Sequence, residues 1–329
     1  MNISSYISSL YIYNNKLFVG YTNGLIRIFD FPSTIKPLHF SKIPYQSNVN
    51  AGDAIIDMQA SNNVLFASTS NKLYCYDFKL DNSDVLSKLF VKEIPDCSNI
   101  KIDYTNHLLF AFSSTKGIIA FNIRNPRKAK FISSLRPVEL KREGNLNLTE
   151  IDVYDKTIFL VIRKSKIIRI DLQEQSDEFG ITKQLVIGRE FDKISLQDPQ
   201  DAKYYHPKNL LYVADADLGF MVINIQTNEI LFTKIFEDGS DFPQKIILLN
   251  GNAVVKTCNG LYFFNFKRRS FDRIFDYKIG SIAKYYNSFI YSKNNKLNYV
   301  RVGRMKIEEE RIMNDSSIQF ERVTEYIPL

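Results

Sequence analysis

The chain has 329 residues, of which 45% are hydrophobic, 13% aromatic and 24% charged. This apolar content is enough for a packed core, and it excludes a chain that is disordered throughout. The formal net charge is +7 at pH 7, with 43 Lys and Arg residues against 36 Asp and Glu. Spread over the whole chain, this excess is mild, whereas a dedicated nucleic-acid-binding protein would usually concentrate it on one face.

Cysteine usage and the N-terminus indicate the compartment. The three cysteines, Cys75, Cys97 and Cys258, form no CxxC pair, which argues against a disulfide framework or a zinc site and fits a reducing compartment. Met1–Tyr6 lacks the basic region of a signal peptide. No window approaches the roughly 20 apolar residues that a membrane helix needs. We therefore expect an intracellular protein, cytoplasmic or alternatively nuclear, without a membrane partner.

One short sequence pattern dominates the chain and occurs seven times. It is a largely apolar run, such as Leu25–Phe31, that ends in one polar residue followed by one more apolar residue. The closing polar positions are Asp30, Asp77, Asn122, Asp171, Asn224, Asn265 and Arg301. Their mean separation of about 45 residues matches the period of four-stranded propeller blades. The abundance of Phe, Tyr, Ile and Val also favours strands.

In chain order, the first three copies each predict four strands separated by short polar turns. In the first copy, a tight turn ending in Gly24 precedes the third strand. The strands expected there are Tyr6–Tyr13, Leu17–Tyr21, Leu25–Phe31 and an outer strand Pro37–Ile43. The second copy predicts Ile55–Ala60, Val64–Thr69, Leu73–Phe78 and Leu86–Ile94, and the third predicts Ile100–Tyr104, Leu108–Phe112, Gly117–Ile123 and Ala129–Leu135.

The remaining copies follow the same plan until the C-terminus. The fourth predicts Leu148–Tyr154, Ile158–Ile162, Ile167–Leu172 and Thr182–Gly188, the fifth Ala202–Tyr205, Leu210–Ala214, Phe220–Ile225 and Ile230–Phe236, and the sixth Gln244–Leu249, Ala253–Thr257, Leu261–Phe266 and Phe271–Lys278. The seventh begins with Ser281–Tyr286, Phe289–Tyr291 and Leu297–Val302. For its outer strand Ser317–Tyr326 is favoured, with Arg304–Met313 as a helical turn or a charged edge strand. We expect the C-terminal segment to close the ring, beside residues 1–5.

These elements define the predicted fold. It is all-β, a single seven-bladed β-propeller of four-stranded antiparallel blades, and one domain spans residues 1–329. The expected blades are 5–44, 53–95, 98–136, 147–189, 193–238, 243–279 and 280–327. The second and third strands are continuous apolar runs because they lie between neighbouring blades and are buried on both faces. One blade cannot bury its own faces, so the blades are expected to be stable only together.

Two copies resemble a known repeat. Gly117–Pro126 followed by Lys130–Leu135 resembles the LVIVD repeat, in which a Gly-led strand ending in Asp and an apolar residue precedes Asn-Pro and an outer strand. Leu211–Gly219 with Phe220–Ile225 is similar but lacks the proline. The chain has neither the Trp nor the Gly-His pairs of WD40 repeats, so it is at most WD40-like. The resemblance implies a propeller with binding surfaces and no defined catalytic residues. An Asp near the end of the innermost strand, also part of the pattern, matches Asp57, Asp103, Asp152 and Asp201.

The recurring polar positions have two interpretations. A set that recurs in every blade could be functional, but side-chain oxygens at strand ends more often accept hydrogen bonds from the backbone of a turn. We therefore predict a structural role for Asp30, Asp77, Asn122, Asp171, Asn224 and Asn265. Arg301 replaces the acceptor in the last copy, as expected for an atypical terminal repeat.

No motif identifies an enzyme. His39, His107 and His206 form no HxH or HExxH pair. Asp215 and Asp217 resemble the start of a calcium loop, but the third acid and the distal Glu are missing, so a hairpin turn is favoured. The chain has no GxSxG, GxxxxGK or GxGxxG motif. We predict no catalytic residues, no metal and no cofactor.

Basic residues gather where turns are expected. Beside the aromatic run Tyr262–Phe266, such cations could form a stacking surface for single-stranded nucleic acid. That run is however a predicted interior strand, so a core strand followed by a basic turn is favoured. The basic residues considered for contact are Arg124, Arg127, Lys128, Lys267, Arg268 and Arg269.

The sequence thus favours a non-catalytic scaffold or adaptor that binds other proteins through its loops, because binding residues concentrate on loops carried by a rigid framework. A nucleic-acid-associated propeller that uses the basic clusters is the alternative, and an enzyme with a pocket in the central channel is a second one. The longer loops expected to hold the site are Pro44–Asp53, Pro137–Asn147, Gln173–Gly180, Glu190–Gln200 and Glu237–Phe242.

Overall fold

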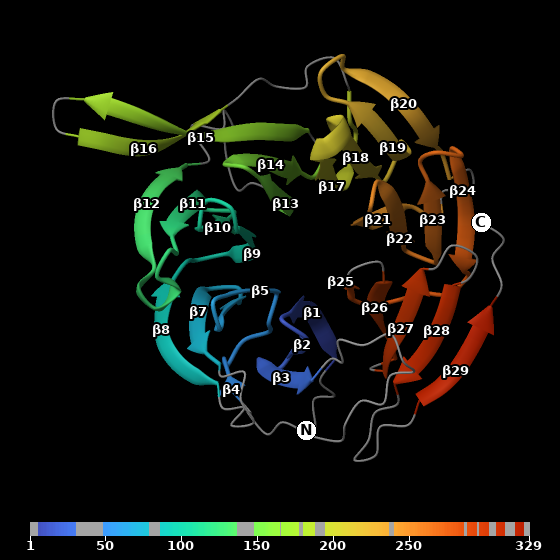
Figure 1. Ribbon diagram of the computed structural model, residues 1–329, viewed down its shortest axis with the longest axis horizontal. Helices are drawn as coiled ribbons and strands as arrows, with labels where there is room; N and C mark the ends of the chain where they lie inside the picture. Colours follow the sequence, from blue (N-terminus) through green and yellow to red (C-terminus); the bar gives the residue numbers. More distant parts are fainter. Residues whose placement is uncertain are drawn as a thin grey trace. The chain divides into compact units, whose positions relative to one another are not determined.

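The protein is all-β, and its seven antiparallel sheets are the blades of a β-propeller (Figure 1), which confirms the predicted fold class. The computed structural model describes residues 6–30, 49–78, 86–136, 148–164, 166–177, 180–187, 195–236, 240–285, 288–294, 296–302, 307–312 and 320–325. In this part of the chain, no helix is long and apolar enough to cross a membrane. Contacts divide the chain into two compact units: unit 1 is Met1–Lys92 with Lys278–Leu329, and unit 2 is Glu93–Tyr277.

Unit 1 contains three sheets, which are blades 1, 2 and 7 in chain order. In this unit the segment that leads into blade 7 contacts blade 1, since the Ser281 hydroxyl donates to the Ser8 carbonyl at 2.8 Å. Blade 1 consists of β1 (Ile7–Tyr13), β2 (Lys16–Tyr21), β3 (Leu25–Asp30) and β4 (Val49–Asn50), and blade 2 of β5 (Asp57–Ser61), β6 (Val64–Ser68), β7 (Lys72–Asp77) and β8 (Ser87–Glu93). Blade 7 consists of β25 (Ile282–Tyr285), β26 (Ser288–Lys293), β27 (Lys296–Val302), β28 (Ile307–Ile312) and β29 (Phe320–Glu325).

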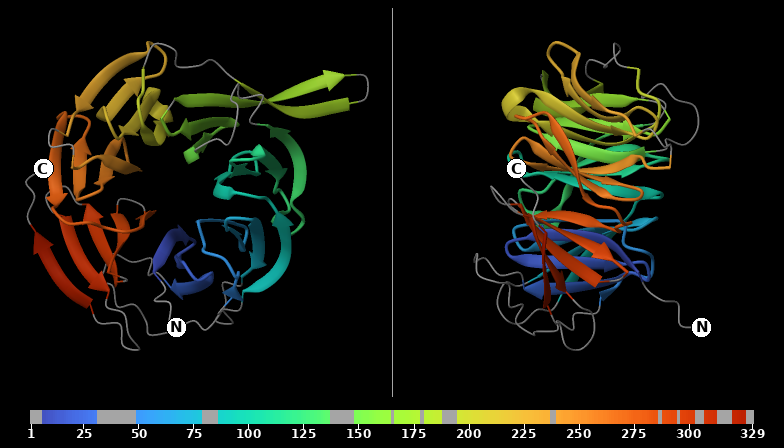
Figure 2. Two further views of the ribbon diagram at one scale, coloured as in Figure 1. Left: turned by 180° about the vertical axis from the view of Figure 1, so that it is seen from behind. Right: turned by 90° about the vertical axis from the view of Figure 1, so that its right-hand side faces the viewer.

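Unit 2 contains blades 3 to 6. Their first strands β9, β13, β17 and β21 follow one another along the inner side of the unit, and the fourth strands lie on its outer side (Figure 2). The single-turn helices η1 (Pro126–Lys128) and η2 (His206–Lys208) belong to connections. Blade 3 consists of β9 (Cys97–Asp103), β10 (Leu108–Ser113), β11 (Gly117–Asn122) and β12 (Lys130–Leu135), and blade 4 of β13 (Leu148–Tyr154), β14 (Thr157–Ile162), β15 (Ile167–Asp177) and β16 (Gly180–Ile187). Blade 5 consists of β17 (Pro199–Tyr205), β18 (Leu210–Asp215), β19 (Gly219–Asn224) and β20 (Glu229–Lys234), and blade 6 of β21 (Pro243–Leu249), β22 (Asn252–Thr257), β23 (Leu261–Asn265) and β24 (Ser270–Phe275).

The hydrophobic core consists of layers between neighbouring blades. Blades 3 and 4 share one layer, in which Phe110, Ile118, Ile151 and Leu160 are buried together. Similar layers join blade 4 to 5, blade 5 to 6, blade 1 to 2 and blade 1 to 7. Every residue of the second strands β2, β6, β10 and β18 is buried. Burial of these strands on both faces, as predicted from their continuous apolar sequence, is confirmed.

The turns between first and second strands explain the asparagines at these positions. Asn14-Asn15, Asn62-Asn63, Asp155-Lys156 and Asn250-Gly251 each join the two strands of a hairpin, and both residues of each pair have positive φ. Two-residue turns of this kind match the twist of antiparallel strands and favour Asn, Asp and Gly. These dipeptides therefore fix the register of the first hairpin in blades 1, 2, 4 and 6.

The structure departs from the predicted elements in three places. Gln173–Asp177, predicted as part of the loop Gln173–Gly180, is a strand, because β15 continues to Asp177 and pairs with β16 as a long hairpin. The polar sequence of this part of β15 is compatible with a hairpin that projects from the blade into solvent. Blade 7 has five strands, and β28 rather than Ser317–Tyr326 pairs with β27. In blade 1 the predicted outer strand Pro37–Ile43 lies outside the described residues, and Val49–Asn50 pairs with β3.

Two glycines that begin third strands occupy positions that no other residue fits. Gly117 and Gly219 have φ of +77° and +89°. A Cβ at these positions would collide with the carbonyl oxygen of Leu135 or Lys234 on the neighbouring fourth strand. The third and fourth strands therefore approach each other closely only because a glycine stands there.

We expect Gly219→Ala to lower the free energy of unfolding by more than about 3 kcal/mol, since positive φ and a backbone collision both act. Gly52→Ala is the matched control, because Gly52 has φ of +84° and no atom within 4 Å of an added Cβ. It should cost only about 1–2 kcal/mol. Denaturant unfolding of both variants measures the difference, and equal losses would contradict a role for the close approach.

Candidate functional site

The recurring polar residues at the ends of third strands hold turns in three blades. The Asn122 side-chain oxygen accepts from the backbone N–H of Arg124 at 2.9 Å. Asn224 accepts from Gln226 at 2.9 Å, and Asn265 accepts from Arg268 at 3.1 Å. In each case the bond stabilises the connection from the third to the fourth strand.

The other recurring positions differ. Asp171 accepts from the Thr157 hydroxyl at 2.7 Å and from the Arg169 guanidinium at 3.1 Å, so it joins β14 to β15. Asp77 is the last residue of β7. The side chains of Asp30 and Arg301 lie outside the described ones. The structure therefore does not gather these positions into one site.

Charged residues line the first strands of unit 2, and the sequence analysis named Asp152 and Asp201 among them but neither Glu150 nor the lysines. Each of these strands has a register shift near its start, and the residue after the shift is Asn99, Glu150, Asp201 or Lys245. Because alternate residues of a strand point to the same face, the positions two residues further along share that face. The inner-strand cluster formed in this way comprises Lys101, Glu150, Asp152, Asp201, Lys203 and Lys245.

Glu150 is the centre of this cluster. Its side chain is 3% exposed, and the ammonium groups of Lys101 and Lys203 lie 3.4 and 3.6 Å from its Oε1. Lys245 contacts the other oxygen. Three lysines from blades 3, 5 and 6 thus converge on one carboxylate of blade 4. A carboxylate this deeply buried must be paired, since an isolated buried charge is strongly unfavourable.

Carboxylates of the first strands also bond to the backbone of the next blade. Asp103 accepts from the backbone N–H of Lys156 at 2.8 Å, and Asp152 accepts from Tyr204 at 2.8 Å. Asp201 accepts from Ile246 at 2.7 Å. Each bond runs from one blade to the next, so the side chain supplies a connection that no backbone ladder supplies between separate sheets.

The LVIVD resemblance placed an Asp near the end of the innermost strand in four blades, and the strand pairing agrees with this in two of them. Asp103 stands opposite the first residue of the second strand and Asp152 opposite the third, so both lie near the end of the first strand. Asp201 and Asp57 stand opposite the fifth, nearer the start of theirs. The three carboxylates of unit 2 thus occupy different steps along successive strands.

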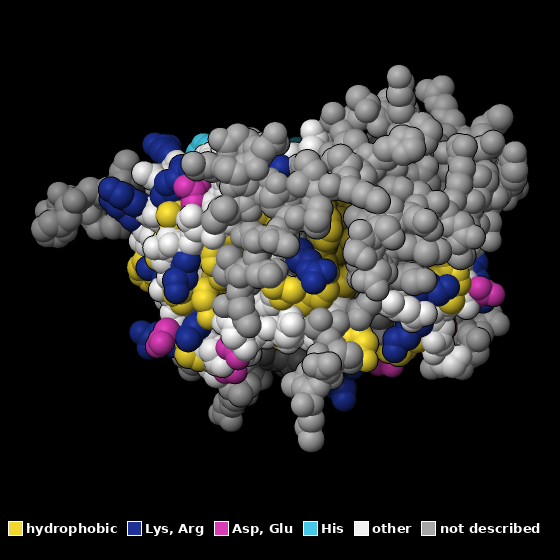
Figure 3. Space-filling view, turned by 90° about the horizontal axis from the view of Figure 1, so that it is seen from below, with side chains coloured by type: hydrophobic (Ala, Val, Ile, Leu, Met, Phe, Trp, Pro, Cys, Tyr) yellow, Lys and Arg dark blue, Asp and Glu magenta, His cyan; other side chains and the backbone are white. Residues whose placement is uncertain are grey.

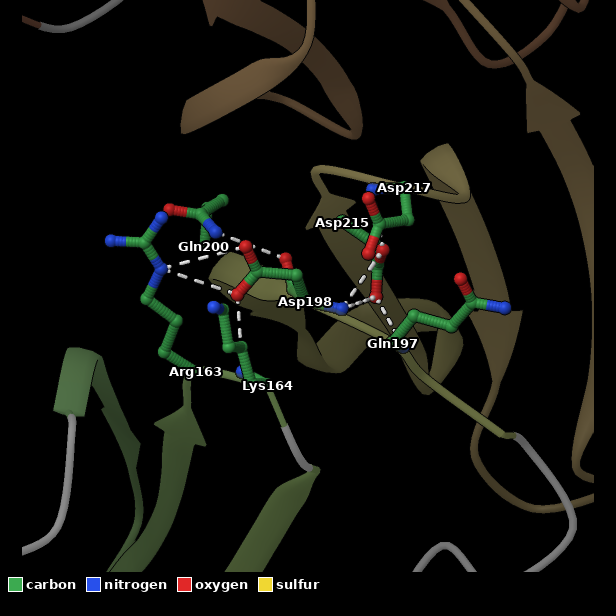
Figure 4. Close-up of polar contacts among 7 residues, drawn as sticks. All are labelled: Arg163, Lys164, Gln197, Asp198, Gln200, Asp215 and Asp217. Atoms are coloured by element: carbon green, nitrogen blue, oxygen red, sulfur yellow. Dashed lines mark hydrogen bonds and ion pairs between the residues drawn. The ribbon is translucent and has the colours of Figure 1, made fainter. Parts of the chain in front are cut away.

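Asp215, the first acid of the predicted calcium-like segment, organises a turn. Its buried carboxylate accepts from the backbone N–H groups of Gln197, Asp198, Asp217 and Leu218, at 2.9–3.1 Å (Figure 4). These bonds tie the turn between β18 and β19 to the segment that leads into β17.

The neighbouring Asp198 connects blade 5 to blade 4. Its carboxylate accepts from the backbone N–H of Lys164 at 3.0 Å and faces the Arg163 guanidinium at 3.3 Å (Figure 4). Within the described residues, no three His, Cys, Asp or Glu side chains gather as metal ligands. Asp198 and Asp215 accept hydrogen bonds from the backbone, and Asp215 does so in the hairpin turn that the sequence favoured for its segment.

The predicted basic residues lie on two equivalent connections of unit 2. Arg124, Arg127 and Lys128 stand between β11 and β12, and Lys267–Arg269 stand between β23 and β24. All six side chains are exposed. Phe263 and Phe264 are buried, so the prediction of a core strand before the second cluster is confirmed for these residues. Figure 3 shows Lys and Arg side chains dispersed among acidic and uncharged ones on the face it presents.

Histidines take part in turns rather than in a common site. His206 stacks on Tyr154 with ring centroids 4.3 Å apart, and His107 has positive φ in the turn after β9. His39 lies outside the described residues.

The comparisons with known proteins concern the fold. No protein-family model and no curated protein matches the sequence. The crystal structure of the computationally designed Ika8 protein is similar, with a TM-score of 0.61 and 10% sequence identity over 97% of this chain and 96% of that one. The likeness is one of fold alone. At this identity it transfers no binding site.

The inner-strand cluster makes stability depend on pH through Asp201. Burial raises the pKa of this carboxyl, although the Lys203 ammonium and the Ile246 N–H lower it. Between the ordinary pKa of the unfolded chain and the raised pKa of the folded one, the folded protein holds a proton that the unfolded chain has released. The Asp201 contribution to the free energy of unfolding is therefore largest at low pH and decreases as the pH rises through this window.

We expect Asp201→Asn to remove this dependence. As the pH rises from about 4, the free energy of unfolding of the wild type should decrease relative to that of the variant. Urea unfolding across the pH range measures it. Asp217→Asn is the control for the loss of one carboxylate of unit 2, because Asp217 is exposed. Parallel curves for Asp201→Asn and wild type would contradict the account.

Proposed function

We propose that the protein is a non-catalytic interaction module, a scaffold or adaptor, that binds a protein partner through the long hairpin of blade 4. The observation that carries this proposal is the extension of β15 and β16 beyond their own sheet. β15 has eleven residues, whereas β11, β19 and β23 have five or six. Figures 1 and 2 show this hairpin projecting from the rest of unit 2.

The projecting part is a two-stranded ribbon. β14 pairs with β15 only as far as Asp171, whereas β16 pairs with β15 as far as Asp177. Among the described strands, Gln173–Asp177 therefore pairs with a neighbour on one side only, and that neighbour is β16. The side chains of Gln173, Glu174 and Gln184 are exposed.

Such a ribbon supports binding by strand addition. An isolated two-stranded hairpin is only marginally stable in water. Its outer edges offer backbone N–H and C=O groups with which an extended segment of another protein can pair. The ribbon is thus better explained as a docking element than as a contribution to the core of blade 4.

The remaining charged residues favour a non-catalytic role. Glu150, Asp152 and Asp201 are engaged with lysines or with the backbone of neighbouring strands. Asp198, just before β17, and Asp215, at the end of β18, also accept hydrogen bonds from backbone N–H groups. Groups that hold strands together are poorly suited to exchange protons with a substrate.

We further propose that the blades are divergent relatives of LVIVD and WD40-like repeats. The glycines that begin β11 and β19, with their close approach to the fourth strand, support this proposal. All three cysteines carry thiols rather than disulfides, which supports an intracellular, reducing location.

Removal of the ribbon tests the proposed function. Gln173 and Gln184 face each other in the hairpin, so replacing residues 174–183 by Asn-Gly closes it with a two-residue turn. We expect the free energy of unfolding to change by less than about 1 kcal/mol. Tagged full-length and shortened chains, recovered from the native cell, should differ by the loss of one stoichiometric protein partner.

The control is Thr227→Ala, which alters the equivalent connection in blade 5 and should leave the partner bound. If the full chain has no stoichiometric partner, or the shortened chain retains every partner, the ribbon does not carry the function.

A further inference from the structure

We infer that one end of the sheets of unit 2 is a binding surface for single-stranded nucleic acid. In antiparallel blades, the connections from first to second strand and from third to fourth strand lie at the same end of the sheet. We call this end of unit 2 the basic edge. Its described connections carry Arg124, Arg127, Lys128, Lys156, Lys208, Lys267, Arg268 and Arg269 and a single acid, Asp155.

The opposite end of the same sheets has balanced charge. Its described connections carry the basic residues Lys116, Arg136, Arg163, Lys164 and Lys166 and the acidic residues Asp96, Asp198, Asp217, Asp241 and Asp276. Among the described connections, the excess of positive charge is thus confined to one end. A concentration of cations on one surface attracts a polyanion far more strongly than the same charge spread evenly.

Direct contacts connect the turns of the basic edge from blade to blade. The Asn106 amide donates to the Asp155 carboxylate at 3.2 Å, which joins blades 3 and 4. The Tyr154 and His206 rings stack between blades 4 and 5. The Lys208 ammonium lies 4.6 Å from the centre of the Phe266 ring, between blades 5 and 6. The turns therefore form one continuous surface rather than isolated loops.

Aromatic side chains on this surface favour nucleic acid over an acidic protein. Tyr104 is 47% exposed in the turn of blade 3, and Tyr154 is 41% exposed at the turn of blade 4. Phe131, next to the basic connection of blade 3, is 60% exposed. Unpaired bases stack on such rings while cations contact the phosphates, whereas an acidic peptide needs only the cations.

Lys156 shows that some of these cations are already partnered, since it pairs with Glu174 at 3.3 Å. The Lys267–Arg269 cluster is the better target for mutation, because its side chains are exposed and its fold depends on the Asn265 contact with the backbone of Arg268. Neutralising these side chains leaves that contact in place.

Binding of nucleic acid at the basic edge does not require the ribbon, so either proposal can fail while the other holds.

The experiment is fluorescence anisotropy with the full chain and a labelled oligouridylate of about 20 nucleotides, titrated at low and at physiological salt. The triple variant Lys267→Gln/Arg268→Gln/Arg269→Gln should weaken binding by about tenfold or more at low salt and reduce the salt dependence, because fewer counterions are released. The control removes three exposed cations from the opposite end, Lys116→Gln/Arg136→Gln/Lys164→Gln, and should bind as the wild type does.

A second variant separates stacking from charge. Tyr104→Ala should weaken binding of the oligonucleotide by about fivefold or more, and leave any binding of polyglutamate unchanged. Absence of binding at low salt, equal losses in the two triple variants, or polyglutamate competing as well as the oligonucleotide would each overturn the proposal. Tighter binding of a duplex would overturn the assignment to single strands.

Discussion

The blades of unit 2 are joined on their inner side by carboxylates that accept backbone N–H groups of the next blade. Separate sheets share no backbone ladder, so the inner strands would otherwise meet only through side-chain packing. Asp103, Asp152 and Asp201 each supply one such bond, and Glu150 collects three lysines around them. Because a buried acceptor or charge without a partner is costly, each bond also fixes the step between neighbouring strands.

Two kinds of interaction hold the blades together: the apolar layers, and the hydrogen bonds between carboxylates and the backbone of the next blade. Burial between second and third strands provides the non-directional attraction. The carboxylate bonds are directional, and they stand at different steps on successive first strands. At Gly117 and Gly219 the third strand approaches the fourth closely, and this contact fixes the position of the outer strand in blades 3 and 5.

The sequence predicted the fold well because its strongest signal, the seven apolar runs, is also the physical core. The short polar turns between the strands were also predicted, because polar residues and glycine are typical of tight turns. The LVIVD resemblance pointed to Asp152 and Asp201 of the inner-strand cluster, but the other four members were missed, although their signal was present in the alternation of charged and apolar residues, as in Glu150-Ile151-Asp152. Such alternation predicts a half-exposed strand, but it does not show which charges from different blades will meet. The ribbon was missed because a polar strand in solvent has the composition of a loop.

The features proposed to bind partners lie outside the repeated runs. The ribbon extends one hairpin of blade 4, and the basic edge is built from the connections of four blades. Both use segments whose sequence varies between blades, while the buried strands stay alike. A repeat fold can therefore change its partners by altering connections without disturbing the layers between blades.

The most direct test of this account is native-state hydrogen exchange at the amides of Tyr204 and Ile246, which donate to Asp152 and Asp201. If the carboxylates hold the blades together, these amides should exchange only when unit 2 unfolds, with protection equal to that of buried second-strand amides such as Leu211. Exchange many times faster than at Leu211, in an otherwise folded protein, would show that the bonds break locally and that packing alone joins the blades.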